Sequence, residues 1–356
     1  QMRRVVRRGL IALLLSSWVV VFSQQLPNEV KLALADPQLN SARIDELNVL
    51  AFDYLKSDPE TSRAAALAIL QKSKELSYAR GHARALNIAG SSYWVVGEYE
   101  LALDYYQLSA REAGAAGDSV SLSQAYHNMG EVYKKVGDLN RSIEYLTLSL
   151  EYDSKHNQPH AIAYYNIGEA YLMQNKLPIA QEYFDKAATQ AILEKSDRTM
   201  AYTYQGQALI KFRKKAYIPA LAYLRKADII WVQLNELRSA IQTHQLYAEV
   251  FLALNEKEIA YEHLDKAVEL AAQIHATDLQ ITNYDQFANL HASQGDYKNA
   301  WSYIIRHNQL RDSLYSIKKT EQIARLQAMF ETESRDIENN LLRKKQNVKD
   351  AQIRSQ

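Results

Sequence analysis

Cysteine is absent from the 356 residues of this chain, and glycine and proline are scarce, with 11 and 6 residues. A chain without cysteine offers no disulfide, thiolate metal site, cysteine nucleophile or lipid-modified cysteine. So few glycines leave little room for the glycine-rich loops that bind nucleotide phosphates. An excess of one charge is also lacking, because 42 Lys and Arg residues stand against 41 Asp and Glu residues. The composition therefore predicts no global field that would attract nucleic acid or an anionic membrane.

Motifs of catalysis and metal binding are missing as well. The sequence contains no GxGxxG, GxxxxGK[ST], HExxH or GxSxG. Its nine histidines are scattered, and the closest pair, His156 and His160, has no acidic residue beside it. The basic clusters at 213–215 and 343–345 are short and typical of solvated faces. We expect a non-catalytic chain with no cofactor, no metal site and no nucleic-acid partner.

The only long apolar run lies near the N-terminus. Four arginines between positions 3 and 8 precede thirteen mostly apolar residues, Leu10–Phe22. The run is shorter than the about 20 residues that span a bilayer, and small residues suit cleavage before Gln24. We expect residues 1–23 to be a secretory signal peptide, with an uncleaved signal anchor as the alternative. The protein is then expected in the periplasm or on the outer side of the cytoplasmic membrane.

Small residues recur about every 40 positions through the middle of the chain. These anchors are Gly90, Gly130, Gly168, Ala208, Ala248 and Ala288. Twelve residues after each anchor comes a second small residue, and sixteen after it comes a large apolar one. Seven after each anchor, five of the six residues are Gly or Asn, which tolerate the left-handed conformation that ends a helix. Three after it, four of the six residues are Tyr or Phe.

Each of these units is interpreted as a helix–turn–helix. The two small columns mark where antiparallel helices cross closely, and the large apolar column packs the second helix against the first. Apolar residues are spaced by three or four, and no window alternates with the period of a strand. The sequence therefore predicts an all-α solenoid of six to seven helix–turn–helix repeats. A weaker first copy is centred on Ala51, with its partner small residue expected at Ala64 or Ala65.

The clearest copies, at 85–106, 125–146 and 163–184, resemble the tetratricopeptide repeat (TPR). Their period of about 40, rather than the usual 34, is similar to that of the long-helix TPRs of bacterial regulators and motor light chains. The resemblance implies a superhelical scaffold that binds proteins or peptides. We divide the chain into a signal peptide (1–23), a linker (24–40), a degenerate first repeat (41–82), a TPR array (83–311) and a C-terminal helix (312–356).

The C-terminal segment, 312–356, has neither Gly nor Pro and carries apolar residues at roughly helical spacing. It reads as an amphipathic or loosely coiled-coil helix that could pair in a homodimer, with a capping helix as the alternative up to Phe330. The run LRDSLYSIKKTEQIARLQAMFETESRDIENNLLRKKQ resembles the juxtamembrane helix of TPR-fronted bacterial signalling proteins. That resemblance implies the exported sensor region of a membrane protein, whose output is most often a histidine kinase, otherwise a cyclase or a helix-turn-helix regulator.

In TPR arrays the first helix of each repeat lines a concave groove, at positions three and two before the anchor and one and four after it. By this resemblance the groove residues are Asn87, Trp94, His127, Asn128, Glu131, Lys134, Tyr165, Asn166, Glu169 and Gln205. Similar long-repeat TPRs hold a peptide backbone with an asparagine two before the anchor, which matches Asn128 and Asn166. An amide side chain can donate and accept at once, as a peptide bond requires. Either a peptide-binding sensor module or a free periplasmic scaffold is consistent with these residues, and a merely hydrated polar face is the alternative.

Overall fold

The computed structural model describes residues 26–155 and 160–314. These residues form helices and turns and no strand, so the predicted all-α fold is confirmed. The helices of the N-terminal half are α2 (Asn28–Ala35), α3 (Ser41–Asp53), α4 (Pro59–Glu75), α5 (Ala79–Val95), α6 (Tyr99–Ala115), α7 (Ser119–Lys135) and α8 (Leu139–Lys155). Those that follow are α9 (Ala161–Met173), α10 (Leu177–Glu194), α11 (Asp197–Arg213), α12 (Tyr217–Leu234), α13 (Leu237–Ala253), α14 (Lys257–Gln273) and α15 (Thr277–Ser293).

The turns between the helices adopt the left-handed conformation that the sequence predicted. All six residues seven after an anchor have a positive φ, from 58° at Lys215 to 85° at Gly137. The lysine shows that the fold imposes this conformation even on a side chain that does not favour it. The turns from the second helix to the next repeat use the same device, for example at Asn235 (φ 52°). Most of the described helices therefore end in the same kind of C-terminal cap, whereas no residue between α3 and α4 has a positive φ.

Small anchors face the large apolar residues of the second helix, as predicted. A Cβ atom placed on Gly90 would lie 2.7 Å from the Tyr106 ring, and one on Gly130 would lie 2.6 Å from Leu146 Cγ. Because real Cβ atoms do not approach so closely, only glycine permits these helices to cross at this distance. Later repeats use a buried alanine as the anchor, such as Ala208.

A second column of rings, fifteen residues after each anchor, packs against the aromatic column. Stacked ring pairs occur in five of the six repeats, with centroids 5.3 to 5.6 Å apart: Tyr93 with Tyr105, Tyr133 with Tyr145, Tyr171 with Tyr183, Phe251 with His263, and His291 with Tyr303. His291 is one of the two residues three after an anchor that are not Tyr or Phe, yet its ring takes the aromatic position. The imidazole is flat and stacks as a tyrosine does.

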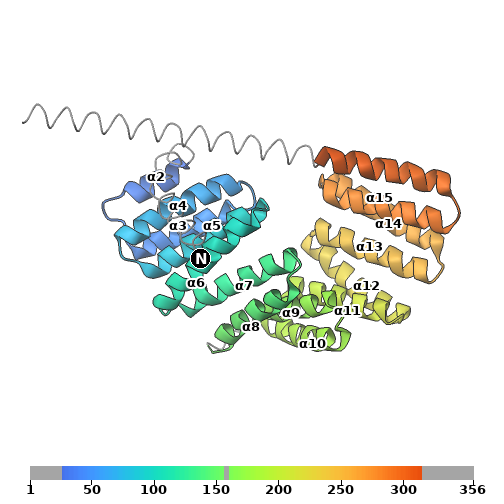
Figure 1. Cartoon of the computed structure of the whole chain (residues 1–356), viewed down its shortest axis with the longest axis horizontal. Coiled ribbons are helices and arrows are strands. Elements are labelled where there is room, and N and C mark those ends of the chain that lie inside the picture. The colour runs from blue at the N-terminus through green and yellow to red at the C-terminus, as the bar shows by residue number, and fades with distance from the viewer. Residues whose placement is uncertain (1–25, 156–159, 315–356) are drawn as a thin grey trace, which may run out of the picture. The chain divides into compact units, whose positions relative to one another are not determined.

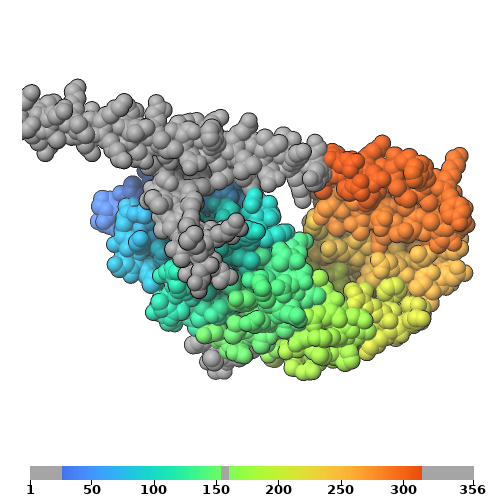
Figure 2. All heavy atoms as spheres, viewed as in Figure 1, coloured from blue at the N-terminus to red at the C-terminus, as the bar shows by residue number. Residues whose placement is uncertain are grey.

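The chain divides into two compact units, one spanning Phe22–Ile274 and one that includes the described residues 275–314. In the larger unit the first helices contact one another, α5 with α7 and α7 with α9. A stack of helix pairs curves toward the side on which its helices come closest, so the first helices form the inner side of this unit (Figure 1). Figure 2 shows its side chains packed from repeat to repeat. The smaller unit holds α15 and a helix that begins at residue 297.

Three details differ from the sequence-based expectation. The predicted linker contains α2, whose Val30 is fully buried, because the short helix NEVKLALA has an apolar side that packs on α4. In the first repeat, Ser62 takes the second small position instead of Ala64 or Ala65, and its Oγ donates to the carbonyl of Ala51 at 2.7 Å. α4 begins eight residues after Ala51, whereas the second helices of later repeats begin nine residues after their anchors, and this difference shifts the column by one residue.

Several predictions fall outside the described residues or stay untested. Residues 1–23, the predicted signal peptide, lie outside them, and so does nearly all of the predicted helix at 312–356. In the last repeat Ile304, which the column predicted to be buried, is 38% exposed. Among the helices that the structure describes, none combines the length and the apolar character needed to cross a bilayer.

Candidate functional site

The ten predicted groove residues lie on four first helices, α5, α7, α9 and α11, on the inner side of the larger unit. Six of them form one group of contacts between α7 and α9. These six residues, called the α7–α9 cluster below, are His127, Glu131, Lys134, Tyr165, Asn166 and Glu169. Equal offsets from the anchors of adjacent repeats bring them together, because neighbouring first helices run side by side.

Lys134 is the centre of the α7–α9 cluster. Its Nζ lies 2.8 Å from Glu131 Oε1, and it donates to Glu169 Oε2 at 2.6 Å and to Asn166 Oδ1 at 3.3 Å. Burial disfavours the ammonium, but the two carboxylates outweigh it and raise the pKa of Lys134 above its ordinary value. The lysine therefore stays charged and joins both helices.

The two ring members of the cluster remain neutral near pH 7. Burial lowers the pKa of His127, so the imidazole loses its proton more readily than in water. The side-chain amide of Asn166 lies 3.4 Å from His127 Nε2, and since an amide nitrogen only donates, that ring nitrogen accepts. Tyr165 donates to Glu169 Oε1 at 3.2 Å. The pKa of Tyr165 is raised well above 10, mainly by burial and to a smaller extent by the charge of Glu169.

A pair of asparagine amides extends the inner row from α7 to α5. Asn128 Nδ2 donates to Asn87 Oδ1 at 2.8 Å. Asn87 is 7% exposed, and its own amide nitrogen has no hydrogen-bond partner among the described residues. Two turns further along α5, Trp94 is 39% exposed. This part of the row offers a buried donor and, further along the same helix, an exposed aromatic ring.

Gln205, the predicted residue on α11, lies apart from the others. Its Nε2 donates to Thr243 Oγ1 at 2.6 Å and to the carbonyl of Ser239 at 3.2 Å, so it joins α11 to α13. The link between α9 and α11 is made by rings instead, because Tyr165 and Tyr202 have centroids 5.5 Å apart. The structure therefore assigns Gln205 to the packing of the next pair of repeats.

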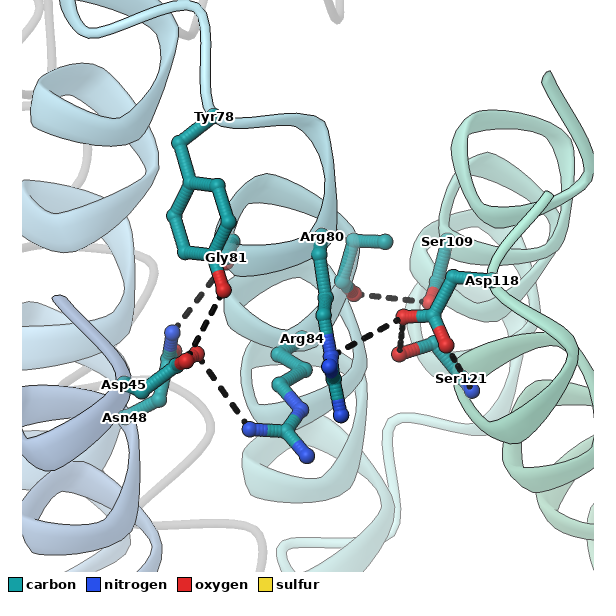
Figure 3. A network of polar contacts seen from close by, with 10 residues as sticks. Asp45, Asn48, Tyr78, Arg80, Gly81, Arg84, Ser109, Asp118 and Ser121 are labelled. Carbon is teal, nitrogen blue, oxygen red and sulfur yellow. Dashed lines mark hydrogen bonds and ion pairs between the residues drawn. The ribbon is translucent and has the colours of Figure 1, made fainter. Parts of the chain in front are cut away.

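Sequence reasoning missed a second polar group on the inner row, at six and ten residues before the anchors. Figure 3 shows it between α3, α5 and α7, and it is called the arginine network below. Arg84 Nη1 lies 3.3 Å from Asp45 Oδ1, and Tyr78 donates to the other oxygen of Asp45 at 2.8 Å. Arg80 Nε lies 3.8 Å from Asp118. These arginines would have been found if the positions taken as groove-lining had been continued by one and two helical turns toward the start of α5.

A histidine pair is a second feature that the sequence did not reveal. His244 on α13 and His263 on α14 bring their Nδ1 atoms to 2.9 Å. Burial, together with the neighbouring His244, lowers the pKa of His263 to about 4, and its ring stacks on Tyr247 at 4.4 Å. Within the described part of the chain, no group of three or more acidic or histidine side chains is arranged to hold a metal ion.

Comparisons with known proteins agree with the repeat pattern. The family described as tetratricopeptide repeat matches residues 123–156, and the family described as soluble NSF attachment protein, SNAP, matches residues 152–318. No curated protein matches the chain in sequence.

Solved structures share the arrangement of helices at low identity. The apo form of RapI has a TM-score of 0.63 and 14% identity, and the match covers 77% of this chain and 99% of that one. A tetratricopeptide repeat protein from Parabacteroides merdae has a TM-score of 0.53 and 15% identity, covering 78% and 97%. The Rap conjugation gene regulator of plasmid pLS20, in complex with the Phr* peptide, has a TM-score of 0.53 and 14% identity, covering 77% and 96%.

These identities show a shared fold only. The sequence match and the shared fold agree with the columns of small, aromatic and left-handed residues described above. The chain therefore has the fold of tetratricopeptide-repeat proteins, built of stacked helix pairs whose first helices line the inner side of its larger unit.

Proposed function

We propose that the chain is a non-catalytic module that binds a peptide or a segment of a partner protein along α5, α7 and α9. The observation that carries this proposal is the inner row itself. Six predicted residues meet in the α7–α9 cluster, and two more meet in the asparagine pair beside it. Polar side chains are thereby gathered on one face of three consecutive first helices.

The chemistry of this face suits an extended backbone. A peptide presents alternating N–H donors and C=O acceptors, which amide side chains can meet in either direction. Asn87 retains a buried amide nitrogen with no partner among the described residues, and leaving such a donor unsatisfied costs about 1–3 kcal/mol. A backbone carbonyl of a ligand would satisfy it. Trp94, two turns further along α5, supplies apolar area, as aromatic residues do at binding surfaces.

The fold supports the same proposal. Among proteins of this fold, the pLS20 Rap regulator was solved in complex with a peptide. Transfer of that property to this chain rests on the inner row and not on the shared fold, because one fold hosts many functions.

A binding assay with matched variants tests the proposal. The full chain is used to select from random heptapeptides displayed on phage, and the most enriched peptide is measured by fluorescence anisotropy. Asn128→Ala is expected to weaken binding by about tenfold. Asn140→Ala is the control, since Asn140 also makes one hydrogen bond to a side-chain amide, here as the acceptor from Gln174 at 2.9 Å, but lies on the second helix α8. Equal affinity of both variants would contradict a site on the inner row.

We also propose that the protein acts outside the cytoplasm as the input region of a signalling protein. Four arginines followed by an apolar run support export. The helix described from residue 297 to 314, followed by a sequence without Gly or Pro, supports transmission along the C-terminal segment. The test uses alkaline phosphatase from which its own signal peptide has been removed. Fusion to residues 1–60 is expected to give phosphatase activity in the periplasm, and fusion to residues 24–60 is expected to give none. If both fusions were inactive, export would be contradicted.

A further inference from the structure

The α7–α9 cluster carries more negative than positive charge. Two carboxylates, Glu131 and Glu169, share the single ammonium of Lys134. Their side chains are only 25% and 34% exposed, and that of Lys134 is 13% exposed. One negative charge is therefore left without a counterion at a half-buried place, where water screens it poorly.

The other residues of the cluster do not supply the missing positive charge. Tyr165 and Asn166 are neutral, and burial favours the neutral form of His127. Asp153, on α8, raises the pKa of His127, as a further negative charge does. The remaining titratable neighbour of His127 is His160, which lies outside the cluster and lowers the pKa of His127. Within the cluster, two carboxylates thus face one ammonium.

Such a surplus is unfavourable in the free protein. A partly buried charge keeps its desolvation cost unless a partner of opposite sign approaches with hydrogen bonds. Tyr165 and Lys134 already hold both oxygens of Glu169, at 3.2 and 2.6 Å, so the carboxylate is fixed in place before a ligand arrives. A preorganised carboxylate binds a cation with little loss of side-chain entropy.

We propose that the α7–α9 cluster is the subsite for a cationic group of the bound peptide, a lysine or arginine side chain or the N-terminal ammonium. This inference rests on the proposed function and adds the chemistry of the ligand. Each good donor of such a group can reach a carboxylate oxygen with a charge-assisted hydrogen bond. An acidic peptide is excluded from the subsite, because its carboxylates would face Glu131 and Glu169.

A cycle of protein and peptide changes tests the proposal. The most enriched heptapeptide is synthesised in its parent form, with its N-terminus acetylated, and with each Lys or Arg replaced by norleucine. Affinity is measured for the wild-type chain, for Glu169→Gln and for Glu182→Gln. The last is the matched control, because Glu182 also pairs with a lysine, Lys186 at 2.7 Å, but lies exposed on the second helix α10. Glu131→Gln serves as a second variant if circular dichroism shows Glu169→Gln to be misfolded.

In the wild type and in Glu182→Gln, removal of one cationic group is expected to weaken binding by about tenfold. In Glu169→Gln, the same change is expected to weaken binding less than about threefold. The peptide form that shows this difference identifies the source of the cation, side chain or terminus. Equal losses in all three proteins, or no loss from any peptide change, would overturn the cationic subsite while leaving peptide binding intact. Failure to select any peptide would instead overturn the proposed function and this subsite with it.

Discussion

Two polar networks lie on the inner row of the same first helices, and they differ in their balance of charge. In the arginine network, two arginines face two aspartates, Arg84 with Asp45 and Arg80 with Asp118. In the α7–α9 cluster, two carboxylates face one lysine. The first network is neutral as a whole, and the second is not.

The partners of the carboxylates differ as well. Asp118 caps α7 and accepts from the backbone N–H of Ser121 at 3.3 Å and from its hydroxyl at 2.5 Å (Figure 3). Such a carboxylate has a structural role that needs no ligand, since it satisfies the start of a helix. Glu131 and Glu169 lie well inside their helices and cap nothing. The comparison teaches that position on the inner row does not distinguish the two networks, whereas their balance of charge does.

The largest effect is expected from breaking α7, which contributes to both networks. Gly130→Leu would place atoms where a Cβ already lies 2.6 Å from Leu146. We expect a loss of about 1–3 kcal/mol or more of unfolding free energy from overpacking. Urea unfolding followed by circular dichroism measures it. Lys135→Leu places the same leucine side chain at an exposed position of α7 and is the control; equal stability of the two variants would show that the helices do not cross closely at Gly130.

A smaller loss is expected when the cluster alone is unbalanced further. Lys134→Met leaves Glu131 and Glu169 without their shared ammonium. Breaking a fully buried pair costs about 3–5 kcal/mol, and because both carboxylates still reach water we expect about 1–2 kcal/mol at pH 7. Thermal melting measures it against Lys186→Met, which breaks an exposed pair worth about 0.5 kcal/mol or less. If the two variants melted alike, the cluster would be no more than a surface ion pair.

Removing one cation from the arginine network is expected to matter less. Arg84 and Asp45 are 31% and 35% exposed, which is typical of a pair worth about 0.2–1 kcal/mol. Arg84→Gln should therefore lower the unfolding free energy within that range and leave peptide affinity unchanged. Isothermal titration with the selected peptide checks the second point. A tenfold loss of affinity would extend the binding site to the arginine network and remove the distinction between the two networks.

The smallest effect at pH 7 is expected from His127→Gln, which keeps an acceptor for Asn166 but cannot titrate. Burial lowers the pKa of His127 in the folded protein below the value of about 6.5 in the unfolded chain. As the pH falls below that value, the unfolded chain binds the proton first, so the wild type loses stability. Between pH 7 and 5 the melting temperature of His127→Gln should fall less than that of the wild type. The melting temperature of Tyr78→Phe, a variant in the arginine network, should fall with pH as that of the wild type does. If the melting temperatures of all three proteins fell equally with pH, a buried neutral His127 would be contradicted.

Much of the fold and part of the site could be predicted from the repeat columns. Small and large residues at fixed spacing report helix crossings directly, and equal offsets on neighbouring first helices brought Lys134 and Glu169 together. The contact of Gln205 with Thr243 could not be predicted, because it depends on the direction of the side chain, and the repeat columns do not determine that direction. Ser62 was missed for another reason, since α4 begins one residue sooner after its anchor than later second helices do, which shifts the column.

Hydrogen–deuterium exchange of the full chain, with and without the selected peptide, tests the central claim most directly. The account predicts slower exchange on peptide binding in α5, α7 and α9, largest around residues 127–134 and 165–169, and little change in the second helices α6, α8 and α10. Protection confined to the second helices, with the first helices unchanged, would contradict a binding site on the inner row.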